Sequence, residues 1–264
     1  MKTNKLQKNS LSLLSNAKKN IISLQKNNDP ENLHRFRINL RKLRSIFKEF
    51  NPYLDEYLYE NLNKKVKFLL TSSNKLRDSD VFLKYLEEYS QLIPENLQDN
   101  FLLLKNKIKE ERELEYKIFL DFIHSEKFIN YFDEVKKILK KNKTYKNKIW
   151  KHFKKTKNMV LKKIQKKVKL KKENLYKNSD SKTFHELRIL YKRLRYLNEL
   201  FVKKNKKNID EFKERQTILG NIQDLCVQQK MLEDQLTNEL KPLVEFLIDI
   251  LKTKENNYKT SFLQ

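Results

Sequence analysis

Apolar residues recur at alternating steps of three and four residues along most of this chain, which is the spacing of one buried face of an α-helix. Asp29 and Pro30 precede one such segment, as an N-cap residue and a proline at the first helical position do. The pattern predicts helices over about 5–26, 30–50, 52–70, 94–123, 127–140, 149–168 and 242–254, an apolar-periodic segment that ends at Tyr89, and a further helix around His185.

The single glycine supports the same fold class. Strand-rich folds and nucleotide-binding α/β folds need glycine for tight turns and for close approach of the backbone. The 264 residues contain four prolines and only one glycine, Gly220. Glycine-rich phosphate loops are excluded for the same reason. We therefore expect an all-α protein.

One of the expected helices carries a basic stripe beside its apolar face. The apolar face is formed by Leu33, Phe36, Leu40, Leu43, Phe47 and Phe50. One position further along are the residues that we name the first basic stripe: His34, Arg37, Arg41, Arg44 and Lys48. One residue turns a helix by about 100°, so this stripe borders the buried face instead of opposing it. Such a position favours the wall of a groove or channel.

A second stretch repeats this pattern. Aligned at their histidines, both copies have Arg three residues later, basic residues at seven and eight, and Arg at ten. In the second copy these positions give the second basic stripe: His185, Arg188, Lys192 and Arg195. Lys42 and Arg193 are the additional basic neighbours at position eight of each copy.

Arginine is concentrated in these two copies, although the chain otherwise uses lysine for positive charge. Seven of the ten arginines lie there: Arg35, Arg37, Arg41, Arg44, Arg188, Arg193 and Arg195. A guanidinium presents a planar fork that binds two oxygens of a phosphate or carboxylate at once. One amphipathic helix with a charged flank is ordinary, but two copies that hold most of the arginine favour an anion-binding role.

The repeated order of the motifs indicates an internal duplication. The histidines of the two copies are 151 residues apart, and Asp78 and Asp224, which align after them, are 146 residues apart. We expect one domain over 1–264, made of two helical bundles over 1–142 and 143–264. Duplicated units commonly pack with pseudo-two-fold symmetry, which would place both stripes in one shared cleft.

The charge and the cysteine content suggest a partner and a compartment. Lys and Arg together number 59 against 34 acids, which gives a formal net charge of +25. A polyanion would relieve the resulting self-repulsion, although a general lysine bias explains part of the excess. Cys226 is the only cysteine, and no export signal or membrane-length apolar run is evident. We expect a cytoplasmic protein that does not bind membranes.

The motif His-x-x-Arg-x-x-x-(Arg/Lys)-x-x-Arg occurs in both copies, and an aspartate-bearing turn follows each at 77–81 or 223–224. This arrangement resembles the CHAD family over nearly the whole chain. The resemblance implies two symmetric helical bundles around a basic central channel that binds inorganic polyphosphate, with no cofactor and with polyphosphate granules as one location. The binding residues it implies are His34, Arg37, Arg41, Arg44, His185, Arg188, Lys192 and Arg195, with Lys42, Lys48 and Arg193 as contributing neighbours.

The two copies differ at two places. Lys192 occurs where the first copy has Arg41, which keeps the charge but loses the fork. The segment 219–220, Leu-Gly, occurs where the first copy has Ser73 and Asn74. The geometry of the first turn therefore cannot be transferred from the second copy.

One string resembles a catalytic signature. Glu113, Glu115 and Lys117 match the Glu-x-Glu-x-Lys pattern of the tunnel-type triphosphatases, a domain to which some CHAD proteins are fused. That pattern works on a strand, where alternate residues share a face. Here it lies in an expected helix, where alternate residues point about 200° apart. We expect a binding protein without catalytic residues.

A metal site and a nucleic-acid interface are two further alternatives for the same residues. His34, His185, Asp78 and Asp224 lack the close spacing of metal ligands, so no metal site is expected. Nucleic-acid binding is the main alternative function, because lysine-rich helices suit phosphate contacts. The stripes contain no aromatic side chain on which bases could stack, and no helix-turn-helix or zinc pattern precedes them. Weak nucleic-acid binding and docking onto acidic protein surfaces remain open.

Overall fold

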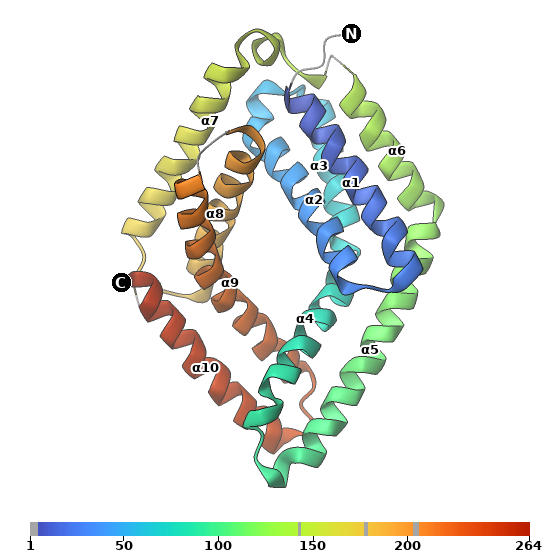
Figure 1. Cartoon of the computed structure of the whole chain (residues 1–264), viewed down its shortest axis with the longest axis vertical. Coiled ribbons are helices and arrows are strands. Elements are labelled where there is room, and N and C mark those ends of the chain that lie inside the picture. Colours follow the sequence, from blue (N-terminus) through green and yellow to red (C-terminus); the bar gives the residue numbers. More distant parts are fainter. Residues whose placement is uncertain (1–4, 142–143, 177–178, 203–205) are drawn as a thin grey trace. The chain divides into compact units, whose positions relative to one another are not determined.

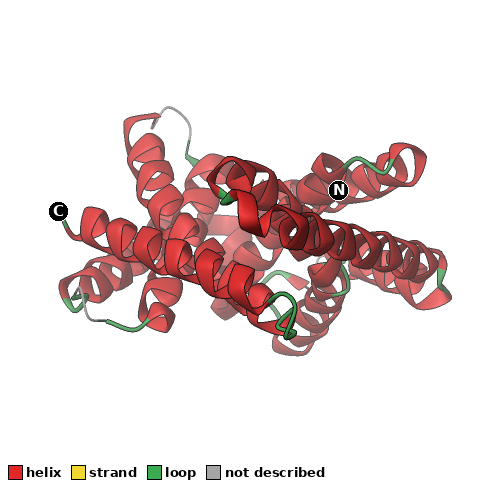
Figure 2. Cartoon of the chain, turned by 90° about the horizontal axis from the view of Figure 1, so that it is seen from below, coloured by secondary structure: helices red, strands yellow, loops and turns green. Residues whose placement is uncertain are grey.

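The computed structural model describes residues 5–141, 144–176, 179–202 and 206–264, and within these ranges it contains ten α-helices and no strand (Figures 1 and 2). The predicted all-α class is confirmed. The helices are α1 (Lys5–Asn27), α2 (Pro30–Phe50), α3 (Glu56–Thr71), α4 (Asn74–Tyr89), α5 (Gln98–His124), α6 (Glu126–Lys140), α7 (Asn147–Glu173), α8 (Ser181–Phe201), α9 (Lys206–Asp234) and α10 (Lys241–Leu263).

Several helix boundaries differ from those that the sequence predicts, among them the start of α3 and the end of α10. Pro52 lies in a short 3-10 helix, Asn51–Tyr53, and α3 begins only at Glu56. Asp55 supplies the N-cap, because its carboxylate accepts a 3.0 Å hydrogen bond from the backbone N–H of Leu58. At the other end of the chain, α10 continues beyond residue 254 to Leu263, and its extra turns bury Phe262 completely.

The two aspartate-bearing turns are not turns. Asp78 lies inside α4 and Asp224 inside α9, so the prediction of a turn at each position was wrong. The break before α4 is short, because residues 72 and 73 alone separate it from α3. Leu76 and Phe82 of α4 are buried, and so are Leu225 and Leu232 of α9. Burial of these apolar positions keeps the aspartates in helices despite their low helix propensity.

Two compact units divide the chain. Unit 1 contains Met1–Arg77, Leu114–Lys163 and Tyr196–Lys203, and unit 2 contains Asp78–Glu113, Ile164–Arg195 and Lys204–Gln264. Both units are thus built from segments that are distant in the sequence. The predicted boundary between two sequence repeats, at 142 and 143, falls outside the described residues, so the division into 1–142 and 143–264 stays a prediction.

Unit 1 has a helical core in which α1 packs against α2 and α6, and α3 packs against the same two helices (Figure 1). Aromatic rings fill its centre. Phe36 of α2 lies with its ring centroid 6.3 Å from Phe119 and 6.5 Å from Phe132. Such pairs stabilise a core beyond the burial of their area, which fixes α2 against α5 and α6.

Unit 2 has a separate core between α4, α5, α9 and α10. Its fully buried members include Leu86, Leu104, Leu247 and Leu251. A polar contact also lies in this core: the hydroxyl of Tyr89 donates a 2.9 Å hydrogen bond to the side-chain oxygen of Gln228. No helix in the part of the chain that the structure describes is long and apolar enough to cross a lipid bilayer.

Candidate functional site

Helix α2 positions the first basic stripe. Asp29 is its N-cap, since the carboxylate accepts a 2.9 Å hydrogen bond from the backbone N–H of Glu31, and Pro30 follows at the first position. The predicted apolar face is confirmed, because all of its members are buried: Leu33, Phe36, Leu40, Leu43, Phe47 and Phe50. Burial of this face fixes the rotation of α2, and the stripe lies at the border of the buried surface as expected.

Arg37 is the most buried member of the stripe, with 4% of its surface exposed. Its Nη1 donates to the carbonyl oxygen of Leu70 at 3.0 Å and to the hydroxyl of Ser73 at 2.7 Å. Its Nη2 donates to the side-chain oxygen of Asn74 at 2.9 Å. Arg37 therefore joins α2 to the junction of α3 and α4, a structural role that the sequence did not predict. Its contact with phosphate stays a prediction.

Arg41 and His34 have a different environment, although both lie on the same face of α2. Each side chain is half-buried. Among the described residues, the Arg41 guanidinium has no hydrogen bond or ion pair, and the His34 ring has no hydrogen bond. A partly exposed guanidinium without a carboxylate partner keeps its charge and its donors available to an anion. These two residues are the clearest candidates for ligand contact in unit 1.

The remaining basic residues of α2 are partly engaged. The ammonium of Lys42 forms a 2.9 Å ion pair with Glu199 and lies 5.6 Å from the ring centroid of Tyr196. The Nε of Arg44 donates a 3.3 Å hydrogen bond to the side chain of Asn63, and Lys48 is exposed. Lys42 would have to leave Glu199 in order to meet a phosphate.

Helix α8 positions the second basic stripe in the same way. Asp180 precedes it, and its carboxylate accepts a 2.8 Å hydrogen bond from the backbone N–H of Thr183. Asp180 thus caps α8 as Asp29 caps α2. Phe184, Leu187 and Tyr191 are buried along one face. The predicted binding residues of α8 are all half-buried at the border of that face: His185, Arg188, Lys192, Arg193 and Arg195.

Residues of α9 hold two members of the second stripe. The Nη2 of Arg188 lies 3.4 Å from a carboxylate oxygen of Asp224. The Nδ1 of His185 shares a hydrogen bond with the side-chain oxygen of Gln223. Asp224 thus holds the arginine of α8, whereas Ser73 and Asn74 hold Arg37 of α2. This difference agrees with the Leu-Gly pair at 219–220, which offers no polar side chain.

Both histidines titrate below their ordinary range. Burial lowers the pKa of His34, and the charges of Arg77, Arg41 and Arg37 lower it further, whereas Glu31 raises it. Burial also lowers the pKa of His185, as do Arg188 and Lys192, against the opposing effects of Gln223 and Glu186. The imidazoles are therefore mainly neutral at pH 7, and the nearby cations make both sites electropositive.

The Glu-x-Glu-x-Lys string lies within α5, as expected from the periodicity. Glu113 forms a 2.7 Å ion pair with Arg112, and Glu115 forms a 3.4 Å ion pair with Lys75. Within the described residues, no group of three or more His, Cys, Asp or Glu side chains is arranged to hold a metal ion. The structure thus gives both glutamates an ion-pairing role.

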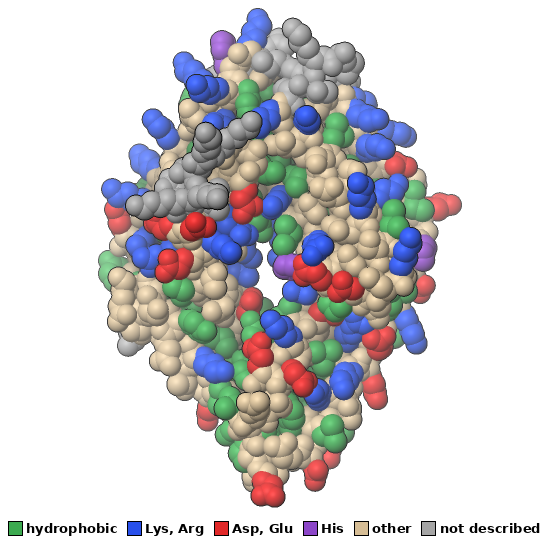
Figure 3. All heavy atoms as spheres, viewed as in Figure 1, with side chains coloured by type: hydrophobic (Ala, Val, Ile, Leu, Met, Phe, Trp, Pro, Cys, Tyr) green, Lys and Arg blue, Asp and Glu red, His purple; other side chains and the backbone are tan. Residues whose placement is uncertain are grey.

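Lysine side chains cover the exposed side of α7, and Figure 3 shows them along the edge that this helix occupies in Figure 1. The predicted basic helix with a buried side is confirmed: Val160, Ile164 and Val168 are buried, while Lys162 and Lys166 are exposed. His152 has non-helical dihedral angles, φ −131° and ψ 35°, and kinks the helix. The periodicity of the sequence does not predict this kink.

The structure therefore places six predicted residues on α2 in unit 1 and five on α8 in unit 2. It adds the side chains that hold them, which sequence reasoning missed: Asn63, Ser73, Asn74, Glu199 and Gln223. Three of them are marked in the sequence: Gln223 as the neighbour of the aligned Asp224, and Ser73 and Asn74 as residues where the two copies differ. The shared symmetric channel stays a prediction.

Comparison with known proteins agrees with these features. A family model for the CHAD domain matches residues 11–233. PptA from Streptomyces chartreusis has a similar structure, with a TM-score of 0.77 and 11% identity over 98% of each chain. The CHAD domain from the plant Ricinus communis has a TM-score of 0.74 and 18% identity, over 98% of this chain and 91% of that one. At these identities the likeness establishes the fold alone. No curated protein matches this chain in sequence.

Proposed function

Because the chain belongs to the CHAD family, we propose that it binds inorganic polyphosphate through its two basic stripes and does not hydrolyse it. The ligand is a linear chain of phosphates, and it needs from the protein only charge and hydrogen-bond donors. Arginine forks and lysine ammonium groups supply both. Neither stripe has a base-stacking platform, which a nucleic-acid interface would use.

The half-buried guanidinium of Arg41 is the observation that carries this proposal. It lies one helical turn from Arg37, whose guanidinium is fixed by its hydrogen bonds, and it has no carboxylate partner among the described residues. Burial lowers the pKa of His34 most, and the charges of Arg77, Arg41 and Arg37 lower it further, which reflects the same excess of positive charge. A phosphate group placed there would neutralise the charge and satisfy the free donors.

The second stripe and the lysines of α7 support the same ligand. Arg188 has one edge of its fork on Asp224, a 3.4 Å contact that is longer than a strong charged hydrogen bond. A phosphate could therefore compete for this guanidinium. The exposed lysines of α7 raise the local concentration of any polyanion by long-range attraction, which salt screens.

A competition experiment tests the proposal against its main alternative. Labelled polyphosphate is bound to the protein at 150 mM salt and is displaced by unlabelled polyphosphate, single-stranded DNA or tRNA at equal phosphate concentration. We expect polyphosphate to compete at least tenfold better, since its charges are denser and carry no sugar or base. Equal or better displacement by tRNA would support the nucleic-acid function instead.

The cellular setting follows from the ligand. We propose a cytoplasmic location that includes association with polyphosphate granules, and we propose no metal or cofactor for binding. Imaging of the tagged protein in cells with and without polyphosphate tests this location. A distribution that ignores polyphosphate would contradict it.

A further inference from the structure

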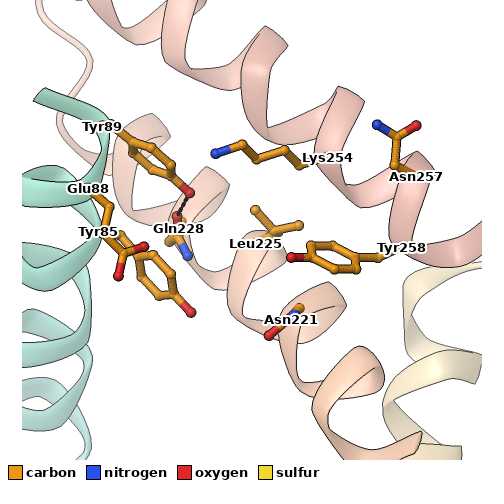
Figure 4. A pocket seen from close by; sticks show the side chains of 9 residues that line it. All are labelled: Tyr85, Glu88, Tyr89, Asn221, Leu225, Gln228, Lys254, Asn257 and Tyr258. Atoms are coloured by element: carbon orange, nitrogen blue, oxygen red, sulfur yellow. Dashed lines mark hydrogen bonds between the residues drawn. The ribbon is translucent and has the colours of Figure 1, made fainter. Parts of the chain in front are cut away.

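Unit 2 contains a pocket that none of the predicted polyphosphate-binding residues lines. It lies between α4, α9 and α10 and has a volume of about 350 Å³ (Figure 4). Pockets of this size hold small organic molecules. Aromatic and polar side chains form most of its wall: Tyr85, Glu88 and Tyr89 of α4, Asn221, Leu225 and Gln228 of α9, and Lys254, Asn257 and Tyr258 of α10.

Gln228 brings an unsatisfied polar group to this pocket. Its side chain is 2% exposed, its oxygen accepts the 2.9 Å hydrogen bond from Tyr89, and its Nε2 has no partner among the described residues. If the amide is flipped, its nitrogen donates to the phenol oxygen of Tyr89 instead, and its oxygen becomes the atom without a partner. A buried amide end without a partner costs stability. A ligand with a complementary polar edge would remove that cost.

Lys254 brings an unpaired charge to the same pocket. Its ammonium lies 4.3 Å from the ring centroid of Tyr89, and it has no ion pair within the described residues. The side chain is half-buried and extends over the pocket in Figure 4. Contact with the ring of Tyr89 replaces part of the hydration that the ammonium loses. An anionic group on the ligand would replace the rest.

The other lining residues suit a flat ring attached to a sugar. The rings of Tyr85 and Tyr89 stack at 6.2 Å, and Tyr258 lies across the pocket from them in Figure 4. Burial raises the pKa of Tyr85 to about 12, so its phenol remains a donor at neutral pH. The side-chain amide of Asn221 offers a donor and an acceptor, as the edge of a nucleobase does.

The one carboxylate that lines the pocket can accept hydrogen bonds from the sugar of such a ligand. Glu88 is exposed, and Lys84 lies 3.8 Å from it, which offsets part of its charge. A carboxylate is the usual acceptor for ribose hydroxyls in nucleotide sites. Its repulsion of a phosphate is reduced by Lys84 and is opposed by Lys254.

We propose that this pocket binds a nucleoside monophosphate. The base lies among the phenol rings and hydrogen-bonds the free end of Gln228, the ribose hydroxyls donate to Glu88, and the phosphate contacts Lys254. Each unsatisfied group described above then has one partner. This site neither depends on the binding of polyphosphate nor contributes to it.

Titration calorimetry on the full chain at 150 mM salt tests the proposal. The four common nucleoside monophosphates, adenosine, ribose 5-phosphate and inorganic phosphate are titrated in turn, with and without polyphosphate. At least one monophosphate should bind with a Kd below about 100 µM, tenfold more tightly than the other three probes, and polyphosphate should not displace it. Lys254→Met and Gln228→Leu should each weaken binding about tenfold, whereas Lys252→Met, an exposed lysine on the same helix, should not.

Three results would overturn the proposal. The first is that no monophosphate binds at 1 mM. The second is that inorganic phosphate binds as tightly as the best monophosphate. The third is that polyphosphate displaces the monophosphate while the Lys254→Met variant binds it as tightly as the unchanged protein does. Circular dichroism confirms that each variant is folded. If Gln228→Leu unfolds, the half-exposed Lys254 still decides the question, because its ammonium supports no buried contact except the ring of Tyr89.

Discussion

The Nη1 of Arg37 and the hydroxyl of Ser73 form a 2.7 Å hydrogen bond that ties α2 to the residues between α3 and α4. An arginine that the sequence marks as a ligand-binding residue is thus nearly buried, and both of its Nη atoms donate hydrogen bonds within unit 1. The same stripe contains Arg41, four residues later, with no such partner among the described residues. Residues of one motif therefore differ in environment: Arg37 holds helices together, whereas the guanidinium of Arg41 has no partner among the described residues.

Replacing Arg37 tests its structural role. Arg37→Met removes three hydrogen bonds from a charged, buried group, and it leaves the Leu70 carbonyl and the Asn74 amide with fewer donors. We expect the free energy of unfolding in urea to fall by about 2–4 kcal/mol. Arg35→Met is the control, since Arg35 is exposed and should cost less than about 0.5 kcal/mol. Unchanged stability would show that these hydrogen bonds do not hold the helices together.

Replacing Arg41 tests ligand contact. Arg41→Lys keeps the charge but removes the fork, and we expect the Kd for polyphosphate to rise about tenfold with no loss of stability. Arg35→Lys makes the same change on the other side of α2 and should alter the Kd less than twofold. Equal effects of the two substitutions would mean that total charge, not the stripe, determines binding.

The histidines should make binding depend on pH. Burial and nearby arginines lower the pKa of His34 in the free protein, and burial, Arg188 and Lys192 lower that of His185. A bound polyanion favours the imidazolium and raises both pKa values. Protons are then taken up on binding, so the affinity is highest below the free pKa and falls as pH rises through the bound pKa.

Affinity measured between pH 5.5 and 8 checks this linkage. His34→Gln together with His185→Gln should flatten the profile. His124→Gln is the matched control, because His124 is hydrogen-bonded to Gln25 and lies on neither stripe. An unchanged slope with uniformly weaker binding would instead assign the two histidines a positioning role only. A positioning role of this kind applies to His185 of α8, because its ring is hydrogen-bonded to Gln223.

A buried ion pair supports unit 2. The Nε of Arg112 lies 3.0 Å from a carboxylate oxygen of Asp80, and only 9% and 2% of the two side chains are exposed. Arg112→Met would leave the aspartate charge buried, so we expect a loss of about 3–5 kcal/mol in unfolding free energy. Lys241→Met breaks an exposed 3.9 Å pair and should cost below about 0.5 kcal/mol. Similar losses of unfolding free energy in the two variants would contradict the burial of the Arg112–Asp80 pair.

Hydrolysis of the ligand is not expected. Glu113 and Glu115 lie on a helix and are paired with Arg112 and Lys75. Incubation of the protein with polyphosphate and Mg²⁺ or Mn²⁺ should release no orthophosphate above the protein-free rate, because the two carboxylates cannot share a metal at this spacing. Steady release that Glu113→Gln and Glu115→Gln abolish would show that this helix is catalytic.

The sequence alone determined the helical class, the apolar faces of α2 and α8, and the aspartate cap of α2. These features are local: a helix forms its backbone hydrogen bonds within four residues, and its apolar period is visible in a short window. For the same reason the grouping of basic residues on α2 and α8 could be predicted, since residues three and four apart share a face.

Only the tertiary structure decided what each basic side chain does. Arg37 is engaged because Ser73 and Asn74 approach it from another helix, and Lys42 is paired because Glu199 comes close from a segment 157 residues away. Asp78 and Asp224 are helical because their neighbours are buried by other helices. The pocket of Gln228 likewise combines three helices. Long side chains have many rotamers, and contacts between distant segments select one of them.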